Sequence, residues 1–102
     1  MRGQTVDNLD ALIHQPVRLR IMAVLSKMPG EDAVDFTYLK RLLDVTDGNL
    51  GAHLLKLEQA GYVKVKKEFV NRKPKTFIRA SGKGRDAFEN HVQALRQIVD
   101  NS

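Results

Sequence analysis

Basic side chains crowd one segment of the sequence, and their common chemistry is the binding of anions. Nine lysines and arginines lie between Lys64 and Arg85, where only Glu68 opposes them. This segment carries a net charge of +8, whereas the rest of the 102-residue chain carries −3. A lysine-rich hairpin that is merely solvated is the plain alternative. The uneven distribution nevertheless favours an anionic polymer as the partner.

The other reactive residue types do not form a catalytic or metal-binding pattern. His14, His53 and His91 fall in three separate segments, without a His pair one helical turn apart or an acidic cluster, so we expect no metal site. No nucleophile–base series, phosphate-binding glycine loop or paired carboxylates is evident, so we expect no enzyme and no cofactor. The absence of cysteine and of a long apolar run leads us to expect a cytoplasmic protein with no membrane partner.

The stretch "TDGNLGAHL", residues 46–54, begins a helix with two glycines, although each costs a helix about 1 kcal/mol relative to alanine. In helical projection Leu50, Leu54 and Leu57 form one apolar face, which we expect to be buried. The opposite face is small or polar, apart from an outward leucine, and comprises Gly48, Asn49, Ala52, Leu55, Lys56 and Gln59. Such a face suits close approach to a nucleic-acid groove, with phosphate at the helix start. For Gly51, packing against the preceding helix explains the glycine equally well.

The elements around this stretch predict a helix-turn-helix. Pro16 begins a helix that ends before Pro29, and residues 31–36 form a short edge strand. Thr37 is expected to cap the next helix, which buries Leu39, Leu42 and Leu43. A turn of about three residues then leads to the helix 47–60, capped by Thr46 or Asp47. Two helices joined by so short a turn are typical of DNA-binding helix-turn-helix motifs.

A basic hairpin and a long helix complete the chain. Alternation in "YVKVKKEF" and "KTFIRA" predicts two strands around the turn-rich "VNRKP". Gly82 and Gly84 are expected to ease the bend into a final helix capped by Ser81. We therefore predict a single α+β domain, mostly helical, over residues 1–102. Within it, residues 9–80 form a winged helix-turn-helix with a two- or three-stranded wing sheet, and residues 81–102 form a long C-terminal helix.

The final helix has two interpretations. An apolar seam could pack back onto the domain, or it could pair with a second copy of the chain; it comprises Phe88, Val92, Leu95 and Val99. Because the helix is long for so small a domain, we favour a homodimer. Leu9, Leu12 and Ile13 are expected to join this interface, and His91 is expected to lie in the same dimer helix.

Three sequence segments resemble the winged-helix regulators related to the MarR and ArsR families. They are "HQPVRLRIMAVL", "DFTYLKRLLDVTDGNLGAHLLKLEQAGYV" and "NRKPKTFIRASGKGRDAFE", and the likeness spans roughly residues 9–100. It implies a homodimer that binds double-stranded DNA, with the third helix in the major groove and the wing, about 69–76, on backbone or minor groove. No residue indicates a small-molecule effector.

The resemblance also implies which residues contact DNA. The third helix would supply Thr46, Gly48, Asn49, Gly51, Ala52 and Lys56. The wing would supply Asn71, Arg72, Lys73 and Lys75. Relatives often carry serine or arginine in place of Gly51, and a basic residue in place of Leu55, so base readout is expected to be thin.

The sequence thus predicts a DNA-binding transcriptional regulator. Two other functions stay open at this point. The outward Gly51, Ala52 and Leu55 suit a protein-interaction module in a larger assembly. The basic hairpin alone suits a weakly selective architectural nucleic-acid binder.

Overall fold

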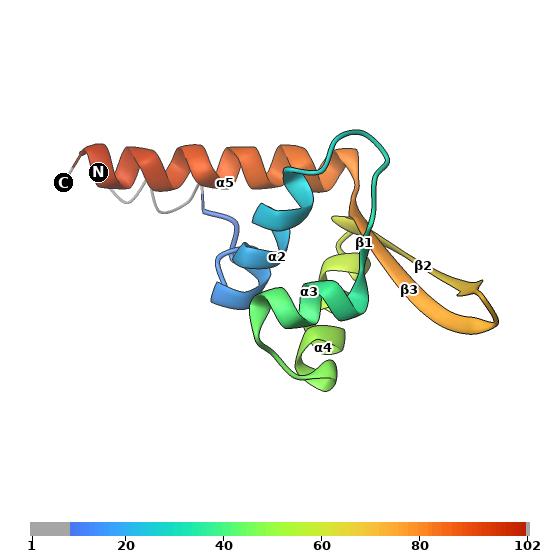
Figure 1. The fold of residues 1–102 in the computed structure, drawn as a ribbon. Coiled ribbons are helices and arrows are strands. Elements are labelled where there is room, and N and C mark those ends of the chain that lie inside the picture. Colours follow the sequence, from blue (N-terminus) through green and yellow to red (C-terminus); the bar gives the residue numbers. More distant parts are fainter. Residues whose placement is uncertain (1–8, 102) are drawn as a thin grey trace.

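The computed structural model describes residues 9–101, which fold as four helices and a three-stranded antiparallel sheet. The elements are α2 (Pro16–Ser26), β1 (Val34–Asp35), α3 (Phe36–Leu43), α4 (Asp47–Gln59), β2 (Val63–Val70), β3 (Lys73–Ala80) and α5 (Gly82–Asp100). In Figure 1, α5 runs along one side of the molecule and α4 lies on the opposite side, while the β2–β3 hairpin projects away from the body. The predicted winged helix-turn-helix with a long C-terminal helix is confirmed.

Side-chain caps define where most helices begin. Thr46 accepts a hydrogen bond from the Asn49 N–H at 3.1 Å, and Ser81 accepts one from the Gly84 N–H at 2.9 Å, as predicted. The predicted Thr37 cap is wrong: α3 already begins at Phe36, because β1 leads directly into it.

The turn between α3 and α4 is as short as predicted. Asp44 adopts a left-handed φ of 55° and ends α3, and its N–H donates back to the carbonyls of Lys40 and Arg41. Leu39 and Leu43 are buried in the core, but Leu42 is 47% exposed, so its predicted burial is wrong. The helix has only eight residues and turns Leu42 away from α2 and the sheet.

The sheet order is β1-β3-β2, and its register separates the two faces of the hairpin. Val63 pairs with Ala80 and Val65 with Ile78, and these pairs face the helices and the core. Beyond them on the same face the hairpin continues with Lys67 opposite Thr76, then Phe69 opposite Pro74. We call this the helix-facing side of the hairpin.

The N-terminal segment of the described chain is held against α5 by a polar cluster. The Asp10 N–H donates to Nδ1 of the fully buried His91 at 3.0 Å, and His91 Nε2 lies 3.2 Å from His14 Nδ1. The Tyr62 hydroxyl donates to the Asp10 carboxylate at 2.6 Å. This bond, then burial and the charge of Asp10, raise the pKa of Tyr62 to about 12. His91 is therefore part of the protomer's interior and not a dimer contact.

Ile13, like His91, lies in the interior of the protomer. Its side chain is fully buried in the core formed with α2, α4 and the sheet. A residue with no exposed surface cannot contact a second copy, so its predicted place in the dimer interface is wrong. The adjacent Leu12 is only half-buried and remains on the surface.

We expect the free energy of unfolding to fall as the pH is lowered from 8 to 5. Burial, followed by the neighbouring His14, lowers the pKa of His91 from 6.5, and Asp10 opposes this more weakly. The unfolded chain then binds the proton more readily. The stabilisation is therefore complete above about pH 6.5 and is lost as the pH falls through the lowered folded-state pKa. His53, whose pKa is also lowered, contributes with the same sign.

Urea denaturation between pH 5 and pH 8 would measure this dependence. The variant His91→Gln should show a flatter profile than the wild type. A wild-type free energy of unfolding that stays level or rises toward pH 5 would contradict the prediction.

Candidate nucleic-acid interface

Among the described residues 9–101, the outer face of α4 is not packed against another element. Leu50, Leu54 and Leu57 are buried as predicted, whereas the opposite positions are open to solvent. A Cβ atom added at Gly48 or at Gly51 would meet no atom within 4 Å. Packing against α3 therefore does not explain Gly51, and this alternative is wrong. The protomer's fold does not require either glycine.

The predicted contacts of α4 lie along one surface strip. Gly48, Asn49, Ala52 and Lys56 are all exposed, Gly51 is half-exposed, and the capping Thr46 stands at the N-terminal end. The strip begins with backbone N–H groups and ends with a cation. It presents little side-chain bulk in between, so a groove can approach the backbone closely.

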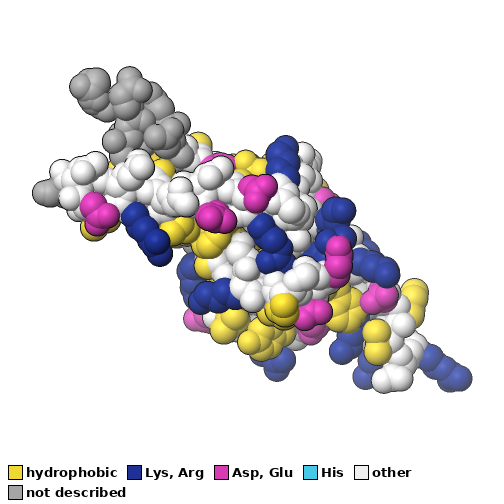
Figure 2. Space-filling model, turned by 90° about the horizontal axis from the view of Figure 1, so that it is seen from above, with side chains coloured by type: hydrophobic (Ala, Val, Ile, Leu, Met, Phe, Trp, Pro, Cys, Tyr) yellow, Lys and Arg dark blue, Asp and Glu magenta, His cyan; other side chains and the backbone are white. Residues whose placement is uncertain are grey.

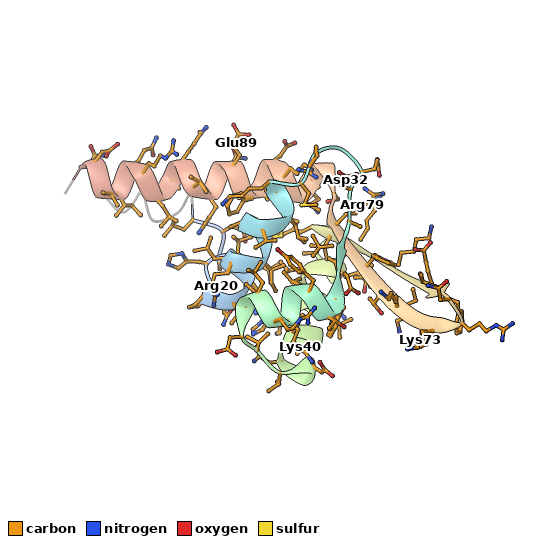
Figure 3. The ribbon with its side chains drawn as sticks, in the orientation of Figure 1. Arg20, Asp32, Lys40, Lys73, Arg79 and Glu89 are labelled. Carbon is orange, nitrogen blue, oxygen red and sulfur yellow. The ribbon has the colours of Figure 1, made fainter. Side chains whose placement is uncertain are left out.

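An ion pair neutralises the acidic residue at the start of this strip. Lys40 of α3 lies 2.9 Å from the carboxylate of Asp47, the first residue of α4. Figure 3 labels Lys40 on α3, where this helix lies next to α4. Asp47 stabilises the helix N-terminus through the helix dipole, and Lys40 reduces its repulsion toward an approaching phosphate.

Arg18 of α2 connects α4 to the segment that precedes α2. Arg18 of α2 donates from Nε to the Leu12 carbonyl at 2.5 Å, and its Nη1 lies 3.0 Å from His53 Nδ1. Because a guanidinium is always a donor, His53 accepts at Nδ1. Burial, then Arg18 and Lys56, lower the pKa of His53. His53 thus anchors α4, consistent with the half-buried position of its side chain.

The hairpin turn presents the wing cations. Asn71 and Arg72 join β2 to β3 with φ values of 53° and 67°, a left-handed pair typical of tight hairpins, where glycine is usual at the second position. Arg72, Lys73 and Lys75 are all exposed. Figure 3 shows Lys73 on the projecting hairpin. Arg72 therefore holds a backbone conformation that glycine adopts more readily.

Two open grooves connect the wing with the helices. One of about 330 Å³ lies between α4 and the hairpin and is lined by Gly51, Leu55, Lys67 and Thr76, among others. A second of about 430 Å³ brings Lys73 and Lys75 next to Thr37 and Arg41 of α3. The wing and the helix-turn-helix therefore form one continuous surface.

Sequence reasoning missed three residues of this surface. Lys67 and Phe69 lie on the helix-facing side of the hairpin, and strand alternation counted outward from Val63 and Val65 would have placed them there. Arg41 reaches the surface through the packing of α3 beside β3, for which the sequence carries no local signal.

The predicted dimer residues other than Ile13 all keep some exposed surface. Leu9, Leu12, Phe88, Val92 and Leu95 are half-buried in the protomer, and Val99 is 70% exposed. Phe88 and Val92 line an open groove of about 480 Å³ between α2 and α5. The homodimer itself stays a prediction.

The three-stranded sheet, the short α3–α4 turn and the projecting basic hairpin define the winged-helix class of nucleic-acid-binding proteins. The chain belongs to the family of winged helix DNA-binding domains, whose model matches residues 17–99. The expected likeness to winged-helix regulators is thereby confirmed.

Related proteins cover nearly the whole chain. An uncharacterized protein of Methanocaldococcus jannaschii is 40% identical over 90 residues, which span 88% of this chain and 95% of that protein. The structure of a transcriptional regulator homologue from Pyrococcus horikoshii OT3 superposes with a TM-score of 0.87 at 27% identity, covering 98% of this chain and 97% of its own. NadR in complex with 4-hydroxyphenylacetate shares the fold, with a TM-score of 0.71 at 21% identity over 97% of this chain and 67% of its own.

Two further findings concern only the described residues. No group of three or more His, Asp or Glu side chains within residues 9–101 is arranged to hold a metal ion. In the same range, no helix combines the length and apolar character needed to cross a bilayer.

Proposed function

We propose that this protein regulates transcription by binding duplex DNA as a homodimer, with α4 in the major groove and the β2–β3 wing on the backbone or minor groove. One observation carries the proposal. The outer face of α4, including two glycines that the fold does not need, lies on the same surface as the basic hairpin. A helix without bulk next to a cationic ribbon is suited to a grooved polyanion.

Helix α4 and the β2–β3 wing carry different side chains and would therefore make different contacts with DNA. Thr46, Asn49 and the N–H groups at the start of α4 can bond phosphate or a base edge, and Lys56 adds a cation at the far end. Gly51 and Ala52 offer no donors. The α4 strip therefore supplies fit and register, while the wing supplies charge.

The dimer is proposed through α5. Helix α5, which carries the exposed Val99 and the half-buried Phe88, Val92 and Leu95, lies on the side of the molecule opposite α4 (Figure 1). Pairing there leaves both α4 helices free to face DNA. A two-fold dimer then calls for two half-sites about one helical turn apart and a pseudo-palindromic target.

The salt dependence of binding tests the proposal. If each protomer neutralises about four phosphates, the logarithm of the binding constant should fall with the logarithm of salt concentration with a slope near −7 for the dimer. Fluorescence anisotropy with a random duplex at several salt concentrations measures this slope. A slope shallower than about −2, or no binding at low salt, would refute the proposed wing contacts.

A protein-interaction module is the second candidate, because the helix-turn-helix exposes apolar side chains. Tyr38, Leu42 and Leu55 are 52%, 47% and 53% exposed. A docking module would bind duplex DNA weakly or not at all in the same titration. The remaining candidate is an architectural nucleic-acid binder, which would bind DNA and RNA with similar affinity and without a preferred sequence. Competition of RNA with duplex DNA therefore distinguishes an architectural binder from a transcriptional regulator.

A further inference from the structure

One side chain at the wing tip does not fit a purely electrostatic role. Phe69 is 80% exposed, the highest value among the large hydrophobic side chains that the structure describes. It lies two residues before the turn, and its cross-strand partner is Pro74. Because Phe69 keeps most of its surface in solvent, packing against Pro74 does not account for it.

The strand register determines which face of the hairpin carries the Phe69 side chain. It belongs to the helix-facing side of the hairpin, in the same alternation as Val65 and Lys67, and these two residues line the groove next to α4. Val70 and Lys73 pair on the opposite face. A partner that extends from α4 along this side of the projecting hairpin therefore reaches Phe69 next after Lys67.

The surroundings of Phe69 select the kind of partner. Lys67 lies on the same face of the hairpin as Phe69, Arg72 stands in the turn, and Lys73 and Lys75 lie on the opposite face of β3. Figure 2 shows hydrophobic side chains among the Lys and Arg side chains at the hairpin end. An apolar residue flanked by cations matches a partner that offers phosphates around an apolar stack of bases. With α4 in the major groove, the wing meets the neighbouring minor groove.

The dimensions of that groove determine what can enter it. A minor groove is about 6 Å wide, narrower than a two-stranded ribbon with its side chains, so only residues at the tip fit. Phenylalanine is among the residues that minor-groove proteins insert between base pairs, partly unstacking them and bending the duplex. Insertion is cheapest at pyrimidine–purine steps such as TA and CA, which unstack easily.

We propose that Phe69 is an apolar wedge that enters the minor groove beside each half-site, bends the DNA and selects deformable base steps there. The inference rests on the proposed DNA binding and deepens it. It assigns sequence preference to the wing, since the α4 strip has few groups that read bases. The preference acts through the energy of deforming DNA and needs no hydrogen bond to a base.

Phe69→Ser tests the wedge, and Val70→Ser is its matched control. Val70 is the next residue of β2, is also apolar and exposed at 36%, and points to the other face of the hairpin. Both variants should keep the wild-type unfolding midpoint within about 2 °C, because neither side chain is buried. Both should also keep the salt slope, because neither removes a cation.

Three readouts are needed on the same duplexes, which carry either TA steps or a stiff A-tract at the wing positions. Fluorescence anisotropy measures the affinity. Energy transfer between dyes at the duplex ends measures the bend, and 2-aminopurine fluorescence at the step measures unstacking. For wild type and Val70→Ser we expect a bend of at least about 20° and about tenfold tighter binding to the TA duplex. For Phe69→Ser we expect both effects to be lost, with A-tract affinity unchanged.

The outcomes separate the two proposals. If Phe69→Ser bends DNA and prefers TA steps as the wild type does, the wedge is refuted while DNA binding stands. If wild type and Val70→Ser bind without bend or step preference, the wedge is likewise refuted. If the wild type binds neither duplex even at low salt, the proposed function fails, and the wedge fails with it.

Discussion

Replacing Gly84 by alanine is expected to lower the free energy of unfolding by about 3 kcal/mol, the upper end of the usual cost of overpacking. Gly84 is buried in the first turn of α5, and a Cβ atom there would lie 2.0 Å from the Tyr62 carbonyl oxygen and 2.8 Å from its carbon. Backbone atoms cannot move aside as a flexible side chain can. The higher helix propensity of alanine offsets only about 1 kcal/mol of this cost.

Gly82→Ala is the matched control for this variant. Gly82 lies two residues earlier in α5, and an added Cβ atom meets nothing within 4 Å. Its free energy of unfolding should stay within about 0.5 kcal/mol of the wild type. Chemical denaturation of the three proteins under one condition gives the comparison. Equal stabilities for Gly84→Ala and Gly82→Ala would show that the close approach to Tyr62 is not needed.

The double variant Arg72→Gly and Lys73→Ala is expected to weaken DNA binding without weakening the fold. Losing two phosphate contacts from each protomer should flatten the salt slope of the dimer by about 4 units and reduce affinity at least about 100-fold at 0.1 M salt. Glycine at position 72 accommodates the φ of 67° more readily than arginine does. Thermal stability should therefore stay level or rise, so binding and stability change in opposite directions.

A charge-matched control shows whether the position of the cations matters. Lys27→Ala with Arg96→Ala removes the same charge from the α2–α5 groove, on the side of the molecule away from α4. Because this groove also borders the proposed dimer helix, sedimentation must first show that the control keeps the oligomeric state of the wild type. The control should then change the salt slope by less than about 1 unit, because distant exposed charges are largely screened. If both double variants flatten the slope equally, binding depends on net charge and the wing has no special role.

The fold was largely predictable because local signals agree with the tertiary structure. Pro16, the Thr46 cap, the Ser81 cap and the alternation after Gly61 each mark an element boundary that the structure retains. The errors at Thr37 and Leu42 have one physical source. Thr37 and Leu42 were assigned from local pattern, but β1 and the short length of α3 determine where that helix begins and which side it exposes.

The candidate site was predictable in its location and less so in its composition. Charge and helical projection locate the α4 strip and the wing without any tertiary information. By contrast, the burial of His91 and Ile13 depends on the segment before α2 folding against α5, and sequence spacing does not encode this. Gly84 shows the same limit. The sequence predicts that Gly84 eases a bend, whereas in the structure glycine is needed because a Cβ atom would collide with the Tyr62 carbonyl group.

The junction between wing and C-terminal helix has a consequence for target architecture. The Ser81 N–H donates to the Tyr62 carbonyl, its hydroxyl donates to the Gly61 carbonyl, and Gly84 lies against the same backbone. These contacts fix the base of the wing, which is proposed to bind DNA, against the start of the proposed dimer helix. The crossing angle of two α5 helices would then dictate the distance between the two wings, and with it the number of base pairs between half-sites. The α5–α5 contact would then determine the spacing of the half-sites, although it lies away from the DNA.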